Sequence, residues 1–249
     1  MILKTHATCL RITPFSRTSH IVVWSAPDAG LLRTVVKGAV RPKSMFLGQY
    51  DLFYDCEILY YARERDGLHI LKECTPLDTR RRFRTDWRGA ALASYACDLR
   101  FRLALTGHDL HRLHAALRAL LDDAAARGAR LAAWLRFELA VLRLLGLTPS
   151  LEQCTVCGRK LGAQPVYIFS VPQGGIVCPD CPVRGPAPPA RLMPAQLHTL
   201  RDPQRSAARE NQRVLLALLG EFLAYHLDLS TAARRLAAAA VVEQGVRDR

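Results

Sequence analysis

The sequence predicts an α+β protein of several parts, in which an N-terminal β-barrel is followed by an all-α helical domain with an inserted four-cysteine ribbon. Three observations support this. Short strand-like segments fill roughly the first 75 residues, helical periodicity begins near residue 80, and two Cys-x-x-Cys pairs interrupt the helical part. We therefore expect a barrel domain at 1–79 and a helical domain at 80–249, with the ribbon at 150–184.

The strand candidates are rich in β-branched and aromatic residues and end at turn residues. They cover residues 5–13, 20–25, 31–37, 51–61 and 68–74. No helix long enough for a parallel crossover lies between them. This pattern favours a small closed barrel of five strands, with the OB type as the first candidate. An SH3-like barrel is the alternative, because strand periodicity alone does not distinguish the two.

Helices are expected over about 87–107, 110–127, 130–145, 208–227 and 231–242, where apolar residues recur at helical spacing. Trp87, Leu92, Tyr95 and Leu99 form the expected apolar face of the first. The segment 130–145 is apolar on nearly every side, which predicts a central buried helix. Residues 185–189, Gly-Pro-Ala-Pro-Pro, indicate a stiff linker after the ribbon.

The ribbon is defined by Cys154-Thr-Val-Cys157 and Cys178-Pro-Asp-Cys181. Between them, residues 166–169 and 176–177 indicate two strands joined by a turn. Two such knuckles can place four thiolates around one Zn²⁺ and leave no open coordination position. A metal-free remnant or a redox pair is the alternative. Disulfides are disfavoured, because the N-terminus carries no secretory signal. We predict one structural zinc ion per chain, held by Cys154, Cys157, Cys178 and Cys181.

The other cysteines are Cys9, Cys56, Cys74 and Cys97, scattered in apolar surroundings. They are expected to be buried free thiols, as is usual in a reducing compartment. No apolar run approaches the length of a membrane span. A cytoplasmic protein is the expectation.

The net charge of +13 comes from 35 basic and 22 acidic residues, and it is densest in the first third of the chain. A basic loop occupies residues 37–44, and the densest basic cluster is Arg-Arg-Arg-Phe-Arg at 80–84. Such a charge favours a polyanionic partner, most commonly nucleic acid. A GC-rich genome would explain the share of arginine but not the sign of the net charge.

Known catalytic patterns are missing from the sequence, which has no P-loop, no Gly-x-Gly-x-x-Gly and no His-Glu-x-x-His. His108, His111 and His114 stand at positions i, i+3 and i+6, which shift progressively around a helix. They are expected to be solvated or capping residues. Asp122 and Asp123 point to different parts of a helix surface and do not form a two-metal pair. An enzyme is not supported.

Two stretches of the sequence carry a family resemblance. The first is residues 36–44, Val-Lys-Gly-Ala-Val-Arg-Pro-Lys-Ser, and the second is Phe137-Glu138-Leu139 with residues 144–149, directly before the first knuckle. Both resemble the RecO family of bacterial recombination mediators, whose loop reads Lys-Gly-Ala-Arg-Arg-Pro-Lys-Ser, with Val40 here where many members have a second arginine. The order of barrel, helices, ribbon and helices agrees over nearly the whole chain, whereas residues 222–226 match only loosely.

The resemblance implies a non-enzymatic DNA-repair protein of the bacterial nucleoid. Such proteins bind single- and double-stranded DNA and anneal complementary strands. With RecR they load RecA onto DNA coated by single-stranded-DNA-binding protein, and RecF is a further candidate partner. The side chains expected to contact DNA are Arg33, Lys37, Arg41, Lys43, Arg80, Arg81, Arg82 and Arg84.

The resemblance also implies docking of the acidic, hydrophobic-ended tail of single-stranded-DNA-binding protein. That ligand needs an apolar notch rimmed by cations, and the leucine- and arginine-rich helices offer both. Arg112, Arg118 and Arg130 are the expected tail contacts. Two other functions stay open. One is a zinc-ribbon nucleic-acid adaptor in transcription or translation, and the other is a metal-dependent nuclease or transferase, which a closed four-cysteine site disfavours.

Overall fold

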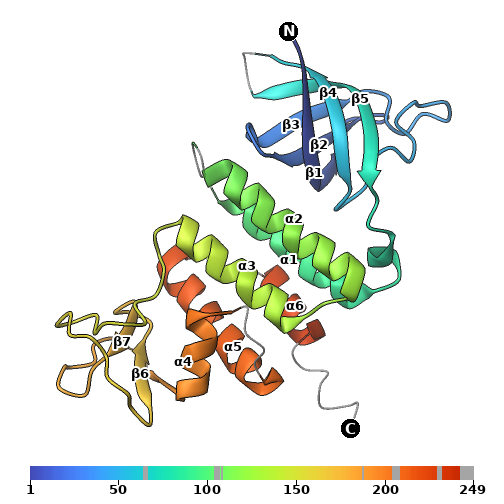
Figure 1. Cartoon of the computed structure of the whole chain (residues 1–249). Helices are drawn as coiled ribbons and strands as arrows, with labels where there is room; N and C mark the ends of the chain where they lie inside the picture. The colour runs from blue at the N-terminus through green and yellow to red at the C-terminus, as the bar shows by residue number, and fades with distance from the viewer. Residues whose placement is uncertain are drawn as a thin grey trace. The chain divides into compact units, whose positions relative to one another are not determined.

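The computed structural model describes residues 1–63, 67–103, 107, 109–186, 188–203, 208–228 and 232–241. The chain forms two compact units, residues 1–128 and 129–249, and each is described by itself. The first contains a β-barrel and the helices that follow it, and the second contains the ribbon and the remaining helices (Figure 1).

The barrel is built from β1 (Ile2–Pro14), β2 (His20–Ala26), β3 (Gly30–Val36), β4 (Asp55–Tyr61) and β5 (Leu68–Asp78). The strands close in the order β1-β2-β3-β5-β4. Only the β3–β5 pairing among these is parallel. The described strands therefore confirm the predicted five-stranded barrel of the OB type.

In β2, β3 and β4 the barrel core contains alternate residues, as the period of two requires. Trp24 is fully buried and donates its indole N–H to Thr34 Oγ1 at 2.9 Å. Cys9, Cys56 and Cys74 lie in the same core, and Cys97 is buried on the first helix. All four are free thiols, which confirms the prediction. Burial raises the pKa of the Cys9 thiol well above its ordinary value.

A short 3₁₀ helix, η1 (Arg81–Arg84), leads from the barrel into α1 (Trp87–Arg102) and α2 (Asp109–Arg127). The two helices pack on each other and on β1, β2 and β3. Leu113, Leu117, Leu120 and Leu121 of α2 are buried. Trp87, expected on the apolar face of α1, is instead 55% exposed.

The histidines of α2 differ from each other. His111 is exposed, in line with the expectation, and His108 lies outside the described residues. His114 is buried and its Nδ1 lies 3.1 Å from Ser25 Oγ, which corrects the expectation of a solvated side chain. Burial, helped by the nearby Arg118 and Arg100, lowers the pKa of His114 to about 4, so the ring is neutral near pH 7.

The second unit contains α3 (Leu131–Leu144), α4 (Pro194–Arg201), α5 (Arg209–Leu227) and α6 (Ala232–Val241). Its sheet has the order β7-β6-β8, from β6 (Tyr167–Ser170), β7 (Gly175–Val177) and β8 (Ala190–Leu192). Most side chains of α3 are buried, which confirms its central place. Strand β8 was not predicted, because a three-residue strand behind a proline-rich segment has no periodic signal.

A buried ion pair joins three helices of this unit. Glu138 of α3 is fully buried and accepts hydrogen bonds from Trp134 Nε1 at 2.8 Å and from Arg234 Nε at 2.8 Å. The Arg234 guanidinium also donates to Glu138 Oε2 and to the carbonyl of Leu216 in α5.

Of the helices in the described ranges, none has the length and apolarity needed to cross a membrane.

Candidate metal centre and nucleic-acid surface

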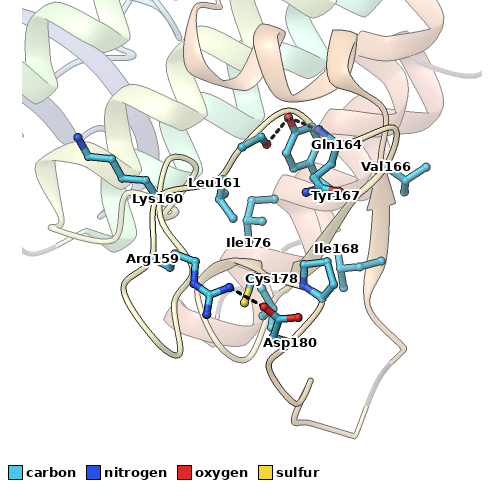
Figure 2. Close-up of a pocket in the computed structure, with 13 residues that line it drawn as sticks. Arg159, Lys160, Leu161, Gln164, Val166, Tyr167, Ile168, Ile176, Cys178 and Asp180 are labelled. Carbon is cyan, nitrogen blue, oxygen red and sulfur yellow. Dashed lines mark hydrogen bonds and ion pairs between the residues drawn. The ribbon is translucent and has the colours of Figure 1, made fainter.

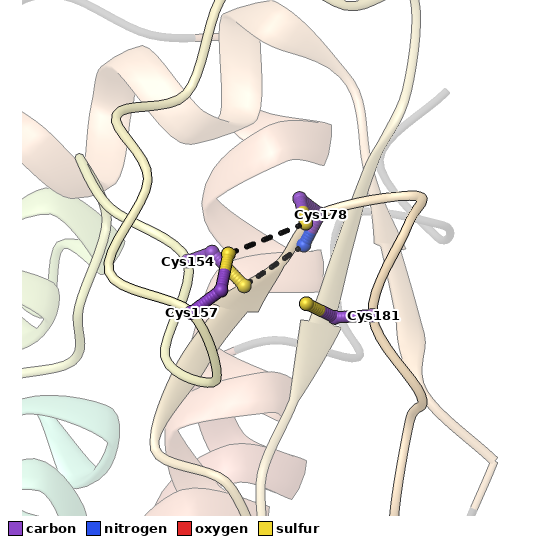
Figure 3. A group of neighbouring side chains, drawn as sticks. All are labelled: Cys154, Cys157, Cys178 and Cys181. Carbon is purple, nitrogen blue, oxygen red and sulfur yellow. Dashed lines mark hydrogen bonds between the residues drawn. The ribbon is translucent and has the colours of Figure 1, made fainter.

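The four ribbon cysteines converge on one point (Figure 3). Their sulfur atoms all lie within 4.8 Å of one another, and Cys157 Sγ is 3.8 Å from Cys178 Sγ. Tetrahedral coordination with zinc–sulfur bonds of roughly 2.3 Å places sulfur atoms about 3.8 Å apart. The cluster therefore has the size and the donor set of a metal site, as predicted. Since the four cysteines would fill a tetrahedral shell, the site leaves no place for a reacting water.

The backbone of the knuckles is arranged around the Cys154 sulfur. The amide N–H groups of Val156 and Cys178 donate to it at 3.4 and 3.3 Å. Gly158 follows the first knuckle at a positive φ of 70°, and its amide donates to the Cys154 carbonyl at 2.9 Å. Burial opposes ionisation of Cys154, but the amide hydrogen bonds outweigh it and lower the pKa of the thiol to about 6. The thiolate, which is the form that binds metal, is thus favoured.

A hollow of about 220 Å³ opens beside the second knuckle (Figure 2). Leu161, Val166 and Ile168 supply apolar lining, and Tyr167 reaches the carbonyl of Gly162 through its hydroxyl. The one arginine of the rim, Arg159, is held by Asp180 at 2.5 Å across the two knuckles. This pairing compensates the charge of Arg159, and Lys160 is the other cation of the lining.

The basic loop lies in the long connection from β3 to β4, which projects from one side of the barrel (Figure 1). Successive tight turns hold it, with the amides of Arg41, Ser44 and Leu47 each bonded to the carbonyl three residues earlier. Ala39 and Phe46 are buried in the barrel core and anchor the loop at two points. The loop is therefore preformed rather than an unstructured chain.

The cations of this segment all reach solvent. Arg33 is exposed on β3, and Lys37, Arg41 and Lys43 are exposed on the loop. No acidic residue occurs between positions 29 and 50, so the local field is positive without compensation along the chain. All four barrel cations expected to contact DNA are therefore exposed to solvent.

The arginines of the cluster at 80–84 differ in their exposure to solvent. Arg80 is only 3% exposed, and its Nε and Nη2 donate to Asp122 Oδ1 at 2.9 and 2.7 Å. Its Nη1 donates to the carbonyl of Phe53. Arg80 therefore fastens the end of the barrel to α2 and does not present its guanidinium to a ligand. We remove it from the expected DNA contacts.

The other arginines of the cluster are exposed. Arg84 contacts Asp51 Oδ2 at 3.4 Å, bonds the Tyr54 hydroxyl and lies 5.7 Å from the centre of the Tyr54 ring. Arg82 pairs with Asp86 at 3.4 Å and donates to the carbonyl of Ala126. Arg84 thus ties η1 to the end of the segment that carries the basic loop.

The leucines expected beside the tail contacts do not form an exposed notch in the described residues. The leucines that would form it (Leu113, Leu117, Leu120, Leu121, Leu131 and Leu135) are all buried in the core. Arg118 pairs with the buried Asp55 at 2.8 Å, and Arg130 is half-buried before α3. Arg112 is exposed, with Asp109 as a distant partner at 3.9 Å. Of the three, Arg112 is the one whose side chain is largely exposed to solvent.

Comparison with known proteins gives matches over both units. Residues 1–80 match the family model described as "Recombination protein O N terminal", and residues 84–235 match "Recombination protein O C terminal". A DNA repair protein RecO of Rhodopirellula baltica is 35% identical over 70% of this chain and 65% of its own length. Another from an Anaeromyxobacter species (strain Fw109-5) is 29% identical over 94% of both chains. A third, from Syntrophus aciditrophicus, is 27% identical over 80% of this chain and 76% of its own.

Proposed function

The chain belongs to the RecO family of DNA repair proteins, and on this premise we propose that it is a non-enzymatic recombination mediator. In this role it binds single- and double-stranded DNA and anneals complementary strands. With RecR it helps to load RecA onto DNA coated by single-stranded-DNA-binding protein. RecF is a further candidate partner, and the site of action is the bacterial nucleoid in the cytoplasm.

The observation that carries the proposal is the preformed basic loop on an OB-type barrel. OB-folds bind single strands by combining a positive groove with stacking groups. Lys37, Arg41 and Lys43 stand exposed on a loop anchored in the barrel core, so little ordering entropy is lost when they meet phosphates. Neutralising phosphates on two strands also lowers their mutual repulsion, which favours annealing.

The metal of the ribbon is proposed to be zinc in a structural role. Four thiolates in tetrahedral reach are the donor set that zinc prefers in closed structural sites. Cys154, Cys157, Cys178 and Cys181 would hold the ion and thereby fix the fold of the ribbon. The site takes no part in a chemical step, in keeping with a mediator that is not an enzyme.

A triple substitution tests the DNA-binding face. Lys37→Ala with Arg41→Ala and Lys43→Ala should weaken binding to all DNA sequences. It should also flatten the dependence of log K on log salt by roughly 0.7–0.9 for each lost phosphate contact. Fluorescence anisotropy of labelled single- and double-stranded oligonucleotides at several salt concentrations measures both quantities.

The matched control removes three exposed cations of the second unit, through Arg143→Ala, Lys160→Ala and Arg191→Ala, and so lowers the net charge equally. It should change the salt dependence much less. An unchanged affinity and slope in the loop variant would contradict the assignment of this loop. Arg81 and Arg84 would then be the next candidates.

Strand annealing separates the mediator from a general zinc-ribbon adaptor of transcription or translation. Complementary strands coated with the cognate single-stranded-DNA-binding protein should anneal faster when the protein is added. Binding to the strands without any acceleration of annealing would favour the adaptor instead.

We also propose that Arg112, Arg118 and Arg130 contribute to docking the acidic tail of single-stranded-DNA-binding protein. Arg112→Glu is the cleanest test, because Arg118 is engaged with the buried Asp55. Charge reversal should weaken binding of the tail peptide and leave the affinity for naked DNA nearly unchanged, with Arg143→Glu as the control. Equal loss of both activities would indicate one shared basic surface, and unchanged peptide binding would place the notch elsewhere.

A further inference from the structure

Trp87 is a large aromatic residue of the first unit that the fold leaves exposed to solvent. The chain has three tryptophans, and Trp24 and Trp134 are fully buried, whereas Trp87 is 55% exposed. A large aromatic side chain usually covers most of its apolar surface in the folded protein. Trp87 opens α1 immediately after η1, at the junction between barrel and helices.

Arginines surround this position in the chain. The guanidinium of Arg88 lies 5.7 Å from the centre of the Trp87 ring, within the range of a cation–π contact. Arg81 and Arg84 are exposed on η1. The neighbouring acid, Asp86, is already engaged, because it accepts the Gly89 amide at 3.0 Å and pairs with Arg82 at 3.4 Å. The indole therefore lies in a surface of net positive charge.

The segment that carries the indole is held firmly. Phe83 packs edge-on against Phe53 with ring centres 5.4 Å apart, and Arg84 contacts Asp51 and Tyr54. Arg82 reaches across to the carbonyl of Ala126 in α2. A ring on such a rigid support loses little conformational entropy on binding, which is the condition for an effective stacking platform.

We propose that Trp87 stacks against an unpaired DNA base, and that Arg81, Arg84 and Arg88 bind the neighbouring phosphates. An exposed indole beside guanidinium groups matches the combination of stacking and charge by which proteins bind single strands. The inference rests on the proposed DNA-binding function and deepens it, since it names a base-contacting residue. It also predicts a preference for unpaired DNA at this position, because paired bases keep their faces within the duplex stack.

Intrinsic fluorescence gives a direct test, because Trp87 is the tryptophan that a ligand can reach. The probes are a thymidine oligonucleotide of about 15 nucleotides, near the upper site size of one OB-fold, and an abasic oligonucleotide of the same length. Both carry an end label, so that anisotropy reports binding independently of tryptophan emission. The thymidine strand should quench the emission on binding, whereas the abasic strand should bind without quenching.

Affinity gives the second readout. Trp87→Ala should weaken binding of the thymidine strand about 5- to 100-fold and leave binding of the abasic strand unchanged. Trp87→Phe keeps an aromatic face and should restore most of the affinity. Tyr225→Ala removes an equally exposed aromatic residue of the second unit and should have no effect on either strand.

The two readouts separate the possible failures. Binding without quenching, or an equal loss of affinity for both strands in Trp87→Ala, would overturn the stacking role while DNA binding stands. Unchanged affinity for the thymidine strand would also overturn it. If neither strand binds in the anisotropy measurement, the proposed DNA-binding function falls together with the inference.

Discussion

Replacing Cys157 with serine is expected to release the metal ion and to unfold the ribbon of the second unit. A structural zinc site of this type contributes about 10–16 kcal/mol of binding free energy, and in small metal domains this energy is folding energy. A serine hydroxyl in place of the thiolate removes one of four strong ligands. The zinc content of the purified protein, measured by elemental mass spectrometry, should fall from one ion per chain to nearly none.

The ribbon depends on the ion because its own core is small. Its buried cluster consists of Cys154, Val177 and Cys178, with Leu161 and Cys181 packed beside them, so that three of its five members are the cysteines themselves. Too little apolar surface is buried there to offset the conformational entropy of the chain. Proteolytic cleavage between residues 150 and 184 should therefore become rapid in the variant.

The loss should spread to the helices on which the ribbon rests. Phe169 of β6 packs against Phe222 of α5 with ring centres 6.0 Å apart, and His226 lies 2.8 Å from the carbonyl of Val171. Hydrogen exchange in α5 should accelerate when these contacts are lost. Cys97→Ala, at a buried thiol outside the cluster, should keep its zinc. Full zinc occupancy in Cys157→Ser, or no metal in the unaltered protein, would contradict the assignment.

Features with a local signal were predicted well from the sequence. The strands of the barrel, the five expected helices and the two strands that join the knuckles each have their own periodicity or turn residues, and they occur close to where they were expected. The metal cluster was also predictable, since the spacing of its cysteines is a property of two short segments. The order of these parts along the chain also agreed with the RecO resemblance.

The environment of single residues was not predictable in the same way. Arg80 and Arg81 are neighbours in a basic run, but only Arg80 meets Asp122, which lies 42 positions further along the chain. Trp87 has the spacing of a core residue and His114 that of a surface residue, and tertiary packing reverses both. Burial and exposure of such residues depend on contacts between segments distant in sequence, and local periodicity contains no information about those contacts.

Glu138 shows the same limit in a residue of the family motif. Its main partner, Arg234, is 96 positions away. The sequence therefore marked Glu138 as part of the family motif but did not indicate which side chain it binds. The guanidinium of Arg234 crosses α5 at Gly220, where an added Cβ would collide with it. A glycine inside a helix is unfavourable by itself, and here the close approach of Arg234 explains it.

Replacing Glu138 with alanine is expected to lower the free energy of unfolding of the second unit by about 3–5 kcal/mol. The substitution leaves the Arg234 guanidinium, whose side chain is 15% exposed, without its carboxylate, and it removes an acceptor of the Trp134 indole N–H. Urea unfolding followed by circular dichroism measures the loss. Hydrogen exchange in α6 should rise as well, because Arg234 joins this helix to α3 and α5.

Most of the stability lost in Glu138→Ala should come from leaving the Arg234 charge largely buried without Glu138. The lost attraction between the two side chains should contribute less. Replacing both partners, through Glu138→Leu with Arg234→Met, should therefore recover most of the stability, since a buried ion pair is often no better than apolar residues of similar size. Glu221→Ala, at an exposed glutamate of α5, should change the stability by no more than about 0.5 kcal/mol. If Glu138→Ala were as mild as this control, or the double variant less stable than Glu138→Ala, the pair would not hold the three helices by this mechanism.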